Sequence, residues 1–325
     1  MAAANASPLL SVRDLRIAFG PRLTAVDGVD FDVAAGEVLG LAGESGSGKS
    51  VTLRAILRLI HPPARVSGEV TWRGRNLLAL PEAEIRRVRG GEIGLIFQEP
   101  MTALNPVLSV GLQIRENLKA HTDLDAAGRR ARAVDLLDLV GIPAARSRIE
   151  DHSHQFSGGM RQRAMIAIAL ASNPRLLLAD EPTTALDVTI QDQILKLLLR
   201  LRRELNMSVI LVTHDLGVIA QTCDRLAVMY AGRVVETGPV ETLFAKPRHA
   251  YTLGLLSSVP RATDRLRQPL ASIPGQPPLL ADLPAGCAFA PRCRFAVEPC
   301  RAARPALAEI APAHRSACIR HAELA

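Results

Sequence analysis

The segment GESGSGKS, from Gly43 to Ser50, brings flexible glycines, a lysine and hydroxyl side chains together within eight residues. It fits the phosphate-loop pattern, in which a glycine and four further residues precede Gly-Lys-Ser. Glycines allow backbone N–H groups to turn toward phosphate oxygens, Lys49 can place positive charge on the outer phosphates, and the Ser50 hydroxyl can ligate magnesium. An ordinary glycine turn before a helix would carry this combination only rarely. The segment therefore predicts a phosphate-binding site.

Two adjacent carboxylates, Asp180 and Glu181, end the apolar run LLLADE. Ligands of open α/β sheets bind at the carboxyl ends of the strands, so both side chains are expected at a binding edge. Asp180 is suited to hold magnesium directly or through water, and Glu181 to orient and deprotonate a water molecule that attacks a γ-phosphate. An isolated Asp-Glu pair is more often a helix cap or part of a solvated loop. The phosphate loop upstream is what favours the catalytic interpretation here.

A second anion-binding helix start is predicted at HQFSGGMRQR, where Ser157, Gly158 and Gly159 directly precede a helical run. On its own, SGG indicates no more than a serine cap followed by flexible glycines. A functional role for this segment therefore depends on the other motifs of the chain.

Short apolar runs and amphipathic segments predict the elements that position these residues. The phosphate loop lies between an expected strand at 36–43 and an expected helix at 50–60. Two further apolar runs, 175–180 and 208–214, predict strands, and the segment 189–206 between them places its apolar residues on one helical face. Strands that alternate with helices indicate an α/β fold with a mainly parallel sheet covered on both sides.

Other segments indicate additions to this sheet. The stretch 99–172 is predicted to be a mostly helical insertion, and 225–238 a hairpin that turns near Ala231 and Gly232. After Pro260 proline becomes frequent and the apolar pattern is lost. We therefore predict one domain at 1–258 and a small extension at 259–325.

Composition excludes several classes of protein. The chain has 325 residues, of which 48% are hydrophobic and 22% charged, as expected for a folding globular protein. No apolar run approaches the roughly 18 to 20 residues of a membrane-spanning helix, and MAAANASPLL lacks the features of a signal peptide, so a cytosolic location is expected. The net charge of +7 is spread along the chain, and we interpret it mainly as a solvated surface, with an anionic partner as the alternative. Aromatic residues make up only 3%, which argues against single-stranded nucleic acid as a partner.

Four of the five cysteines lie near the carboxyl end of the chain. They are Cys287, Cys293, Cys300 and Cys318, separated by five, six and seventeen residues, whereas Cys223 is expected to be a packed core thiol. Cytosolic conditions disfavour disulfides, so clustered thiols more often indicate a metal. Structural zinc sites usually have ligand pairs spaced more closely, while iron–sulfur clusters tolerate several spacings. The spacing alone leaves a 4Fe-4S cluster, zinc and free thiols open.

The ordered motifs GESGSGKS, IFQEP, FSGGMRQR, LLLADEPTTALD and LVTHD resemble those of the ATPase subunit of ABC transporters. The resemblance covers about residues 9 to 238 and implies a P-loop ABC-type ATPase fold. Such a fold has a RecA-like parallel sheet core, an antiparallel β part and a helical subdomain, here expected at about 99–172. A small C-terminal metal-binding extension would follow it.

The resemblance also implies roles for individual residues. Glu181, His214 and Gln98 would be catalytic, His214 as the switch histidine and Gln98 as a sensor of magnesium and the γ-phosphate. Ser50, Gln98 and Asp180 would hold Mg²⁺. ATP would be bound by Phe19, stacked on adenine, and by Gly43, Glu44, Ser45, Gly46, Ser47, Gly48, Lys49, Ser50 and Val51. The ATP of an opposite subunit would be contacted by Ser157, Gly158, Gly159 and Asp187.

The signature departs from the commonest LSGGQ, since Phe156 and Met160 replace its first and last residues. The wording FSGGMRQR and the stretch 98–114 are instead similar to the peptide and nickel importer branch. The tail motifs HAYTLGLLSSVP, IPGQPP and CAFAPRC resemble the extension of dipeptide and oligopeptide importer ATPases. Some of these proteins hold a 4Fe-4S cluster, which the resemblance implies for the four clustered cysteines, with Zn²⁺ as the alternative.

This resemblance implies an ATPase that powers peptide import by hydrolysing ATP to ADP and phosphate. We expect it on the cytoplasmic face of the inner membrane, peripherally bound. Its partners would be a second, homologous or identical ATPase, two transmembrane permease subunits contacted through 98–114, and indirectly an external binding protein, with no nucleic acid. Import of nickel or another small solute is the alternative. A soluble ABC ATPase of DNA repair or translation is disfavoured because the chain has a single ATPase unit with a short insertion.

Overall fold

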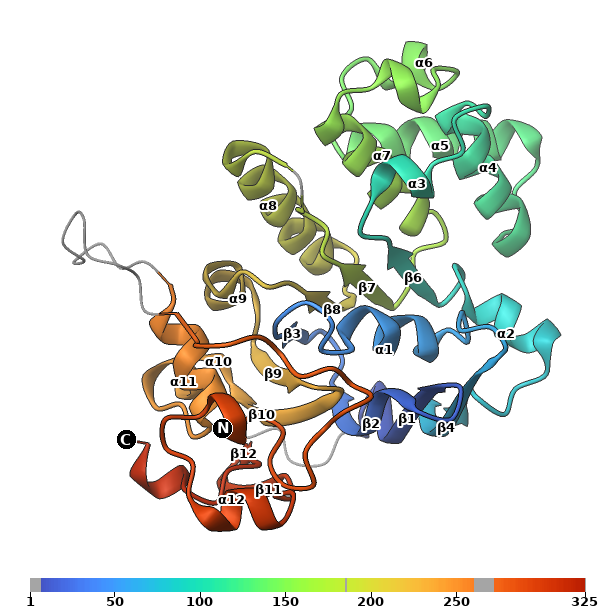
Figure 1. Cartoon of the computed structure of the whole chain (residues 1–325). Helices are drawn as coiled ribbons and strands as arrows, with labels where there is room; N and C mark the ends of the chain where they lie inside the picture. The colour runs from blue at the N-terminus through green and yellow to red at the C-terminus, as the bar shows by residue number, and fades with distance from the viewer. Residues whose placement is uncertain (1–6, 185, 260–271, 325) are drawn as a thin grey trace. The chain divides into compact units, whose positions relative to one another are not determined.

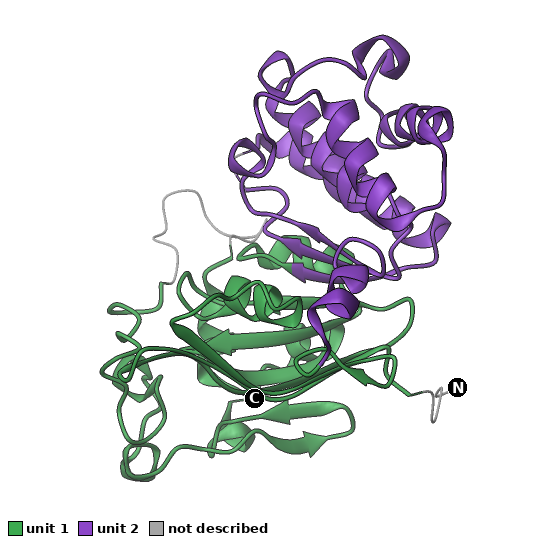
Figure 2. Cartoon of the chain, turned by 90° about the vertical axis from the view of Figure 1, so that its right-hand side faces the viewer, with its two compact units in different colours: residues 1–79, 212–325 green, residues 80–211 purple. Residues whose placement is uncertain are grey.

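The computed structural model describes residues 7–184, 186–259 and 272–324, which form two compact units. Unit 1 comprises residues 1–79 and 212–325, and unit 2 comprises residues 80–211, as Figure 2 shows. The predicted extension at 259–325, called the tail below, contains the four clustered cysteines. It therefore belongs to the same unit as the phosphate loop. The domain division predicted at 258/259 stays a prediction, and Pro260 itself lies outside the described residues.

Unit 1 contains an antiparallel sheet with the strand order β2-β1-β4-β5. In β1, four apolar residues are fully buried while the charged residues between them are exposed, as expected for a strand with one covered face. The buried residues are Leu10, Val12, Leu15 and Ile17, and the exposed ones are Arg13, Asp14 and Arg16. The hairpin of β1 and β2 closes where Phe19 pairs with Leu23. The strands are β1 (Leu10–Phe19), β2 (Leu23–Val33), β4 (Ala64–Trp72) and β5 (Arg75–Asn76).

A second group of strands in unit 1 has the order β11-β12-β10-β9-β3. Strand β3 pairs in parallel with β9, which forms the predicted hairpin with β10. Ala231 and Gly232 have positive φ angles of 47° and 78°, as a tight hairpin turn requires, so this prediction is confirmed. The strands are β3 (Val38–Ala42), β9 (Arg225–Tyr230), β10 (Arg233–Pro239), β11 (Ala308–Ala311) and β12 (His314–Ser316).

The tail extends this sheet, because β12 pairs antiparallel with β10 and β11 pairs with β12. At this junction Glu236 of β10 is fully buried. Its carboxylate accepts hydrogen bonds from the backbone N–H groups of Arg248 (2.6 Å) and His249 (3.0 Å), and it lies 2.8 Å from Nε2 of His314 in β12. A buried carboxylate is tolerated only with such partners, so β12 is part of the environment that β10 requires.

The helices of unit 1 are short. The helix predicted at 50–60 begins and ends earlier, at Lys49 and Ile56, because Arg58 adopts a left-handed φ of 51° that stops helical growth. An aromatic cluster of Tyr230, Tyr251 and Phe289 packs against α10 and α11, with the tail cysteines Cys287, Cys293 and Cys318 at its margin. The helices are α1 (Lys49–Ile56), α9 (Leu216–Thr222), α10 (Val240–Ala245), α11 (Ala250–Ser257) and α12 (Glu298–Ala302), labelled in Figure 1.

Unit 2 combines three strands, in the order β8-β7-β6, with helices. Strands β6 (Ile93–Ile96), β7 (Leu176–Asp180) and β8 (Ser208–Val212) include the two runs predicted as strands, and β7 and β8 are buried at every position, as in a sheet covered on both faces. Helix α8 (Val188–Glu204) confirms the predicted amphipathic helix and buries Ile194, Leu197, Leu198 and Leu201. The other helices are α2 (Glu82–Val88), α3 (Pro100–Ala103), α4 (Val110–His121), α5 (Ala126–Leu139), α6 (Ala145–Arg148) and α7 (Gly158–Ala169). None of the helices in the described parts of the chain combines the length and apolar character needed to span a bilayer.

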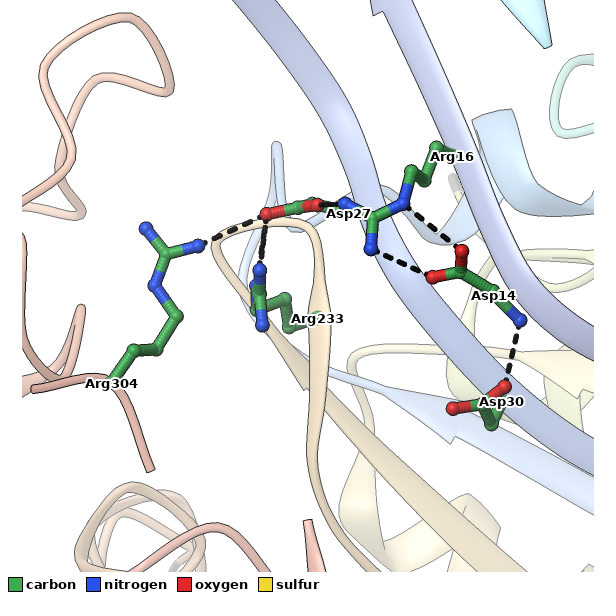
Figure 3. A network of polar contacts seen from close by, with 6 residues as sticks. All are labelled: Asp14, Arg16, Asp27, Asp30, Arg233 and Arg304. Atoms are coloured by element: carbon green, nitrogen blue, oxygen red, sulfur yellow. Dashed lines mark hydrogen bonds and ion pairs between the residues drawn. The ribbon is translucent and has the colours of Figure 1, made fainter. Parts of the chain in front are cut away.

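A network of charged side chains joins the tail to β2 (Figure 3). Asp27 accepts from Nε of Arg233 at 3.1 Å and from Nη1 of Arg304 at 3.0 Å, and it also pairs with Arg16. Burial opposes ionisation of Asp27, but the hydrogen bond and charge of Arg233, with the charges of Arg16 and Arg304, outweigh it and lower the pKa of Asp27. This carboxylate therefore neutralises guanidinium groups from three segments of unit 1.

Replacing Asp27 with asparagine should lower the free energy of unfolding at pH 7 by about 1 to 3 kcal/mol, because partly buried guanidinium groups lose their charged acceptor. The folded state favours the ionised form, so the contribution is complete above the ordinary pKa of 3.8 and disappears as the pH falls through the lower folded pKa. The stability difference, measured by urea denaturation, should be constant from pH 7 to about pH 5 and shrink below about pH 4.

The control for this change is Asp14→Asn, since Asp14 is mostly exposed. It should alter stability by less than about 0.5 kcal/mol. Equal unfolding free energies for the wild type and Asp27→Asn at pH 7 would contradict the proposed contribution.

Candidate functional site

The phosphate loop connects β3 to α1 and passes very close to neighbouring main chain. A Cβ atom on Gly43, whose φ is 149°, would lie 2.1 Å from the carbonyl oxygen of Met229 in β9. A Cβ atom on Gly48, whose φ is 100°, would lie 2.7 Å from the carbonyl oxygen of Ala25 in β2. Real Cβ contacts are never this short, and both φ values favour glycine. The first glycine of the motif and the one before Lys49 are therefore required by packing.

Hydrogen bonds from the β9–β10 turn hold the loop in place. The backbone N–H of Gly232 donates to the carbonyl oxygen of Ser47 (3.1 Å), and the N–H of Asp27 donates to the carbonyl oxygen of Gly232 (2.9 Å). The loop thus rests on a hairpin that is itself tied to β2. Its conformation is determined by several strands together with its own residues.

Lys49 is nearly buried at the start of α1, with its ammonium group turned toward the loop. Its Nζ atom donates to the carbonyl oxygens of Gly43 (2.7 Å) and Glu44 (3.0 Å). Ser50 lies in the first turn of the same helix, where the helix dipole favours anions. This combination of a fixed ammonium group, a hydroxyl group and a helix start can bind a polyphosphate.

A cavity of about 270 Å³ lies beside the loop. Its walls include Leu23, loop residues 44–47, the turn at Tyr230 and Ala231, and tail residues 277–280. Phe19, the residue predicted to stack on adenine, pairs with Leu23 and is 39% exposed. An aromatic face is thus accessible at the hairpin end next to a residue that lines this cavity. His214 also belongs to unit 1 and is exposed in the segment between β8 and α9.

The carboxylates of unit 2 are held at the end of β7. Asp180 is 2% exposed, and Glu181 follows it with a left-handed φ of 47°, an unfavourable conformation for a residue with a side chain. The Oε2 atom of Glu181 accepts from the Thr184 hydroxyl (2.8 Å) and from Nε2 of Gln98 (3.3 Å). The structure therefore brings two predicted catalytic residues, Gln98 and Glu181, together within unit 2.

The predicted signature residues form a capped helix start. The Ser157 side chain accepts from the N–H of Met160 (3.3 Å) at the beginning of α7. A Cβ atom on Gly159 would lie 2.9 Å from Cγ2 of Ile190 in α8. Asp187 caps α8 by accepting from the N–H of Ile190 (2.9 Å). Ile190 thus contacts both the signature segment, at Gly159, and the residue that caps α8, Asp187.

All four tail cysteines line one small cavity of about 20 Å³. Burial raises the pKa values of Cys287, Cys293 and Cys318, although backbone N–H groups donate to each of these sulfurs. Four thiols are a donor set that zinc and iron–sulfur clusters both use. Yet within residues 7–184, 186–259 and 272–324, no group of three or more His, Cys, Asp or Glu side chains is arranged to hold a metal ion. The structure therefore does not support the predicted metal-binding character of the tail.

Cys223 lies apart from these four, packed between α9 and β3. Burial raises its pKa to about 12, and its sulfur lies 3.1 Å from the position of a Cβ atom on Gly40. Its neighbours include the apolar core of unit 1. These contacts agree with the predicted packed thiol.

Two contacts of the phosphate-loop residue Glu44 could not be predicted from the sequence. Arg292 of the tail forms a two-pronged ion pair with the loop residue Glu44, at 2.7 Å and 2.9 Å. The hydroxyl of Tyr251 accepts from the N–H of Glu44 (2.7 Å). The partners are separated by 248 and 207 positions, so neither local spacing nor periodicity could indicate them.

Comparison with known proteins identifies two family regions. Residues 26–184 match the family described as ABC transporter, and residues 235–300 match the oligopeptide/dipeptide transporter C-terminal region. A putative peptide import ATP-binding protein of Brucella melitensis is 51% identical, with 98% of each chain covered. The oligopeptide transport ATP-binding protein OppD of Escherichia coli K12 is 48% identical, with 99% of this chain and 96% of OppD covered.

Solved structures agree with this assignment. The ATP-binding cassette MJ0796, in a dimeric post-hydrolysis state bound to ADP and Pi, matches with a TM-score of 0.64 and 29% identity, covering 71% of this chain and 98% of its own. The structure of cbiO1 from Clostridium perfringens, part of the transporter complex cbiONQ, matches with a TM-score of 0.64 and 28% identity, covering 74% and 91% of the two chains. These similarities confirm the predicted fold of the ATPase part.

Replacing Gly43 with alanine should destabilise the protein by more than about 2 kcal/mol, since the added methyl group meets backbone that cannot retreat like a side chain. The matched control is Gly46→Ala. Gly46 also has a positive φ, 79°, but a Cβ atom there would meet nothing within 4 Å, so the cost should be limited to about 1 kcal/mol of backbone strain. Chemical denaturation of the three proteins tests this, and equal losses for both variants would refute the packing argument.

Proposed function

Because this chain belongs to the ABC transporter ATP-binding proteins that carry the oligopeptide/dipeptide transporter C-terminal region, we propose that it is the ATP-hydrolysing subunit of a peptide importer. The observation that supports this function is the packed glycine loop with the Lys49 ammonium group turned toward it, an arrangement that can bind a polyphosphate. The peptide substrate is supported by the names of relatives that match nearly the whole chain. Import of nickel or another small solute remains the alternative within the same branch.

In this proposal the loop residues 43–51 surround the phosphates of ATP and Phe19 contacts adenine. The Lys49 ammonium group donates to carbonyl oxygens of the loop. When ATP binds, it can donate to phosphate oxygens instead. Ser50, Gln98 and Asp180 would hold Mg²⁺, whose chemistry is to neutralise charge on the outer phosphates. Oxygen ligands of this kind suit a hard divalent cation.

Glu181 is the proposed general base. Its carboxylate is directed by two hydrogen bonds, from Thr184 and Gln98, and its own backbone is held in a strained conformation. Such positioning reduces the reorganisation needed when a water molecule is deprotonated. His214 would contact the γ-phosphate. Gln98 would respond to the γ-phosphate by giving up its hydrogen bond to Glu181.

Hydrolysis in this proposal requires two ATPase subunits. Ser157, Gly158, Gly159 and Asp187 would contact ATP held by the opposite subunit, as the helix start at α7 is suited to bind an anion. Dimer closure on ATP and reopening after hydrolysis would move two permease subunits docked near residues 98–114. The dimeric state of the related cassette MJ0796 supports this arrangement. Docking on permease subunits would place the chain peripherally on the cytoplasmic face of the membrane.

For the tail we propose a four-thiolate metal site, with a 4Fe-4S cluster as the first candidate and Zn²⁺ as the alternative. The proposal is supported by Cys287, Cys293, Cys300 and Cys318 sharing one cavity and by backbone N–H donors to three of the sulfurs. Because no three of these side chains are arranged to hold a metal ion within the described residues, either group would require the thiols to move. We assign no catalytic step to this site.

Glu181→Gln should reduce steady ATP hydrolysis by about 10²- to 10⁴-fold, because the amide cannot accept the proton from water. ATP affinity, measured with a fluorescent ATP analogue, should stay within about threefold of the wild type, since the change keeps the shape of the side chain. The control is Glu204→Gln at the exposed end of α8, which should retain full turnover. Undiminished hydrolysis by Glu181→Gln would overturn the proposed mechanism.

Anaerobically purified protein should contain about four iron and four sulfide per chain and absorb near 400 nm. The absorbance should be lost in Cys300→Ser and retained in Cys223→Ser, since Cys223 lies outside the four-thiol cavity. Stoichiometric zinc without iron would select the alternative ion. Protein without either metal, under conditions in which it is folded, would exclude the site.

A further inference from the structure

We propose that Arg292, in the tail segment between Cys287 and Cys293, positions the phosphate loop and neutralises a carboxylate within it. This inference rests on the ATP site proposed above. It adds a residue outside the ATPase motifs, and it makes the affinity for ATP depend on how the tail is folded.

All three guanidinium nitrogens of Arg292 donate hydrogen bonds. Its Nη1 and Nη2 atoms donate to Oε2 and Oε1 of Glu44 at 2.7 Å and 2.9 Å, and its Nε atom donates to the carbonyl oxygen of Pro274 at 2.9 Å. Nη1 also lies 3.3 Å from the hydroxyl of Tyr230. The side chain is only 6% exposed. A fixed, bidentate geometry of this kind is specific to arginine, because lysine offers a single point charge.

Glu44 is also held through its backbone. Its N–H donates to the Tyr251 hydroxyl at 2.7 Å. Tyr251 is fully buried and its ring lies 4.5 Å from that of Tyr230, which Arg292 contacts. The carbonyl oxygen of Glu44 in turn accepts from Nζ of Lys49 at 3.0 Å. A shift of Glu44 would therefore displace an acceptor that determines where the Lys49 ammonium group lies.

The charge of Glu44 makes the ion pair more than a structural contact. Glu44 belongs to the segment that surrounds the triphosphate, and it lines the cavity beside the loop. A carboxylate without a partner there would repel the phosphates, whereas the Arg292 guanidinium cancels its charge. Removal of Arg292 should therefore weaken ATP binding both by loosening the loop and by exposing a negative charge.

The position of Arg292 is set by the turns of the cysteine segment. The N–H of Ala290 donates to the carbonyl oxygen of Cys287 (2.9 Å), and the N–H of Cys293 donates to the carbonyl oxygen of Ala290 (3.3 Å). Arg292 stands within this turn, with its guanidinium carbon 5.9 Å from the centre of the Phe289 ring. A change in this turn is therefore transmitted to Glu44 without any intermediate helix or strand.

The experiment compares ATP dissociation constants and the kinetic constants of hydrolysis in the full-length protein. Arg292→Ala should raise the dissociation constant about 10-fold or more and raise KM similarly, while kcat at saturating ATP changes less than about threefold. Arg292→Lys should recover part of the affinity. Combining Arg292→Ala with Glu44→Gln should bind ATP more tightly than Arg292→Ala alone, because the unpaired charge has been removed.

The matched control is Arg301→Ala, which removes an exposed arginine elsewhere in the tail and should leave the ATP dissociation constant unchanged. An unchanged dissociation constant in Arg292→Ala would overturn the proposal. If that variant does not fold, Arg292→Lys decides, and wild-type affinity in it together with no effect of Glu44→Gln would equally overturn it. A wild-type chain that binds ATP without hydrolysing it would contradict the proposed function and leave the binding comparison valid.

Discussion

The contact between the phosphate loop and the main chain of its neighbours is the constraint on which the rest of unit 1 depends. Gly43 lies against the Met229 carbonyl and Gly48 against the Ala25 carbonyl, so the loop is shaped by β9 and β2 at once. The turn at Gly232 joins these two strands to the loop through a pair of backbone hydrogen bonds. Because backbone groups supply these contacts, the strands that contact the loop determine where the Lys49 side chain lies.

The tail adds side-chain contacts to this backbone frame at three separate places. Arg292 reaches the loop, Arg304 reaches Asp27 on β2, and His314 reaches Glu236 on β10. Each contact joins a tail residue to a carboxylate of the ATPase part, and two of these carboxylates lie at or next to elements that shape the phosphate loop. Two of these contacts, those of Arg292 and Arg304, are ion pairs that join the tail to the ATPase part within unit 1.

The sequence predicted what depends on local pattern. The apolar runs that became β3, β7 and β8, and the one-sided helix α8, could be recognised because burial imposes a fixed periodicity on a strand or a helix. The glycine-rich loop could be recognised because its chemistry requires consecutive residues. The early end of α1 was missed, since the left-handed conformation of Arg58 has no signal in a residue type that favours helices.

Contacts between distant positions were also beyond prediction. Gln98 and Glu181 could be paired only through the family resemblance, and the ion pair of Arg292 and Glu44 could not be anticipated at all, because no rule relates residues 248 positions apart. The grouping of the four cysteines around one cavity agrees with their predicted clustering. Whether thiols bind a metal depends on atomic distances, which spacing along the chain does not determine.

The pairing of β12 with β10 has a consequence for how this protein could have changed during evolution. Without the tail, β10 would present a row of unpaired N–H and C=O groups to solvent, a template for association with other chains. The buried carboxylate of Glu236 would lose its histidine neighbour at the same time. A protein that lost the tail during evolution would therefore also need substitutions along the exposed edge of β10. We therefore expect the ATPase part and the tail to be inherited together.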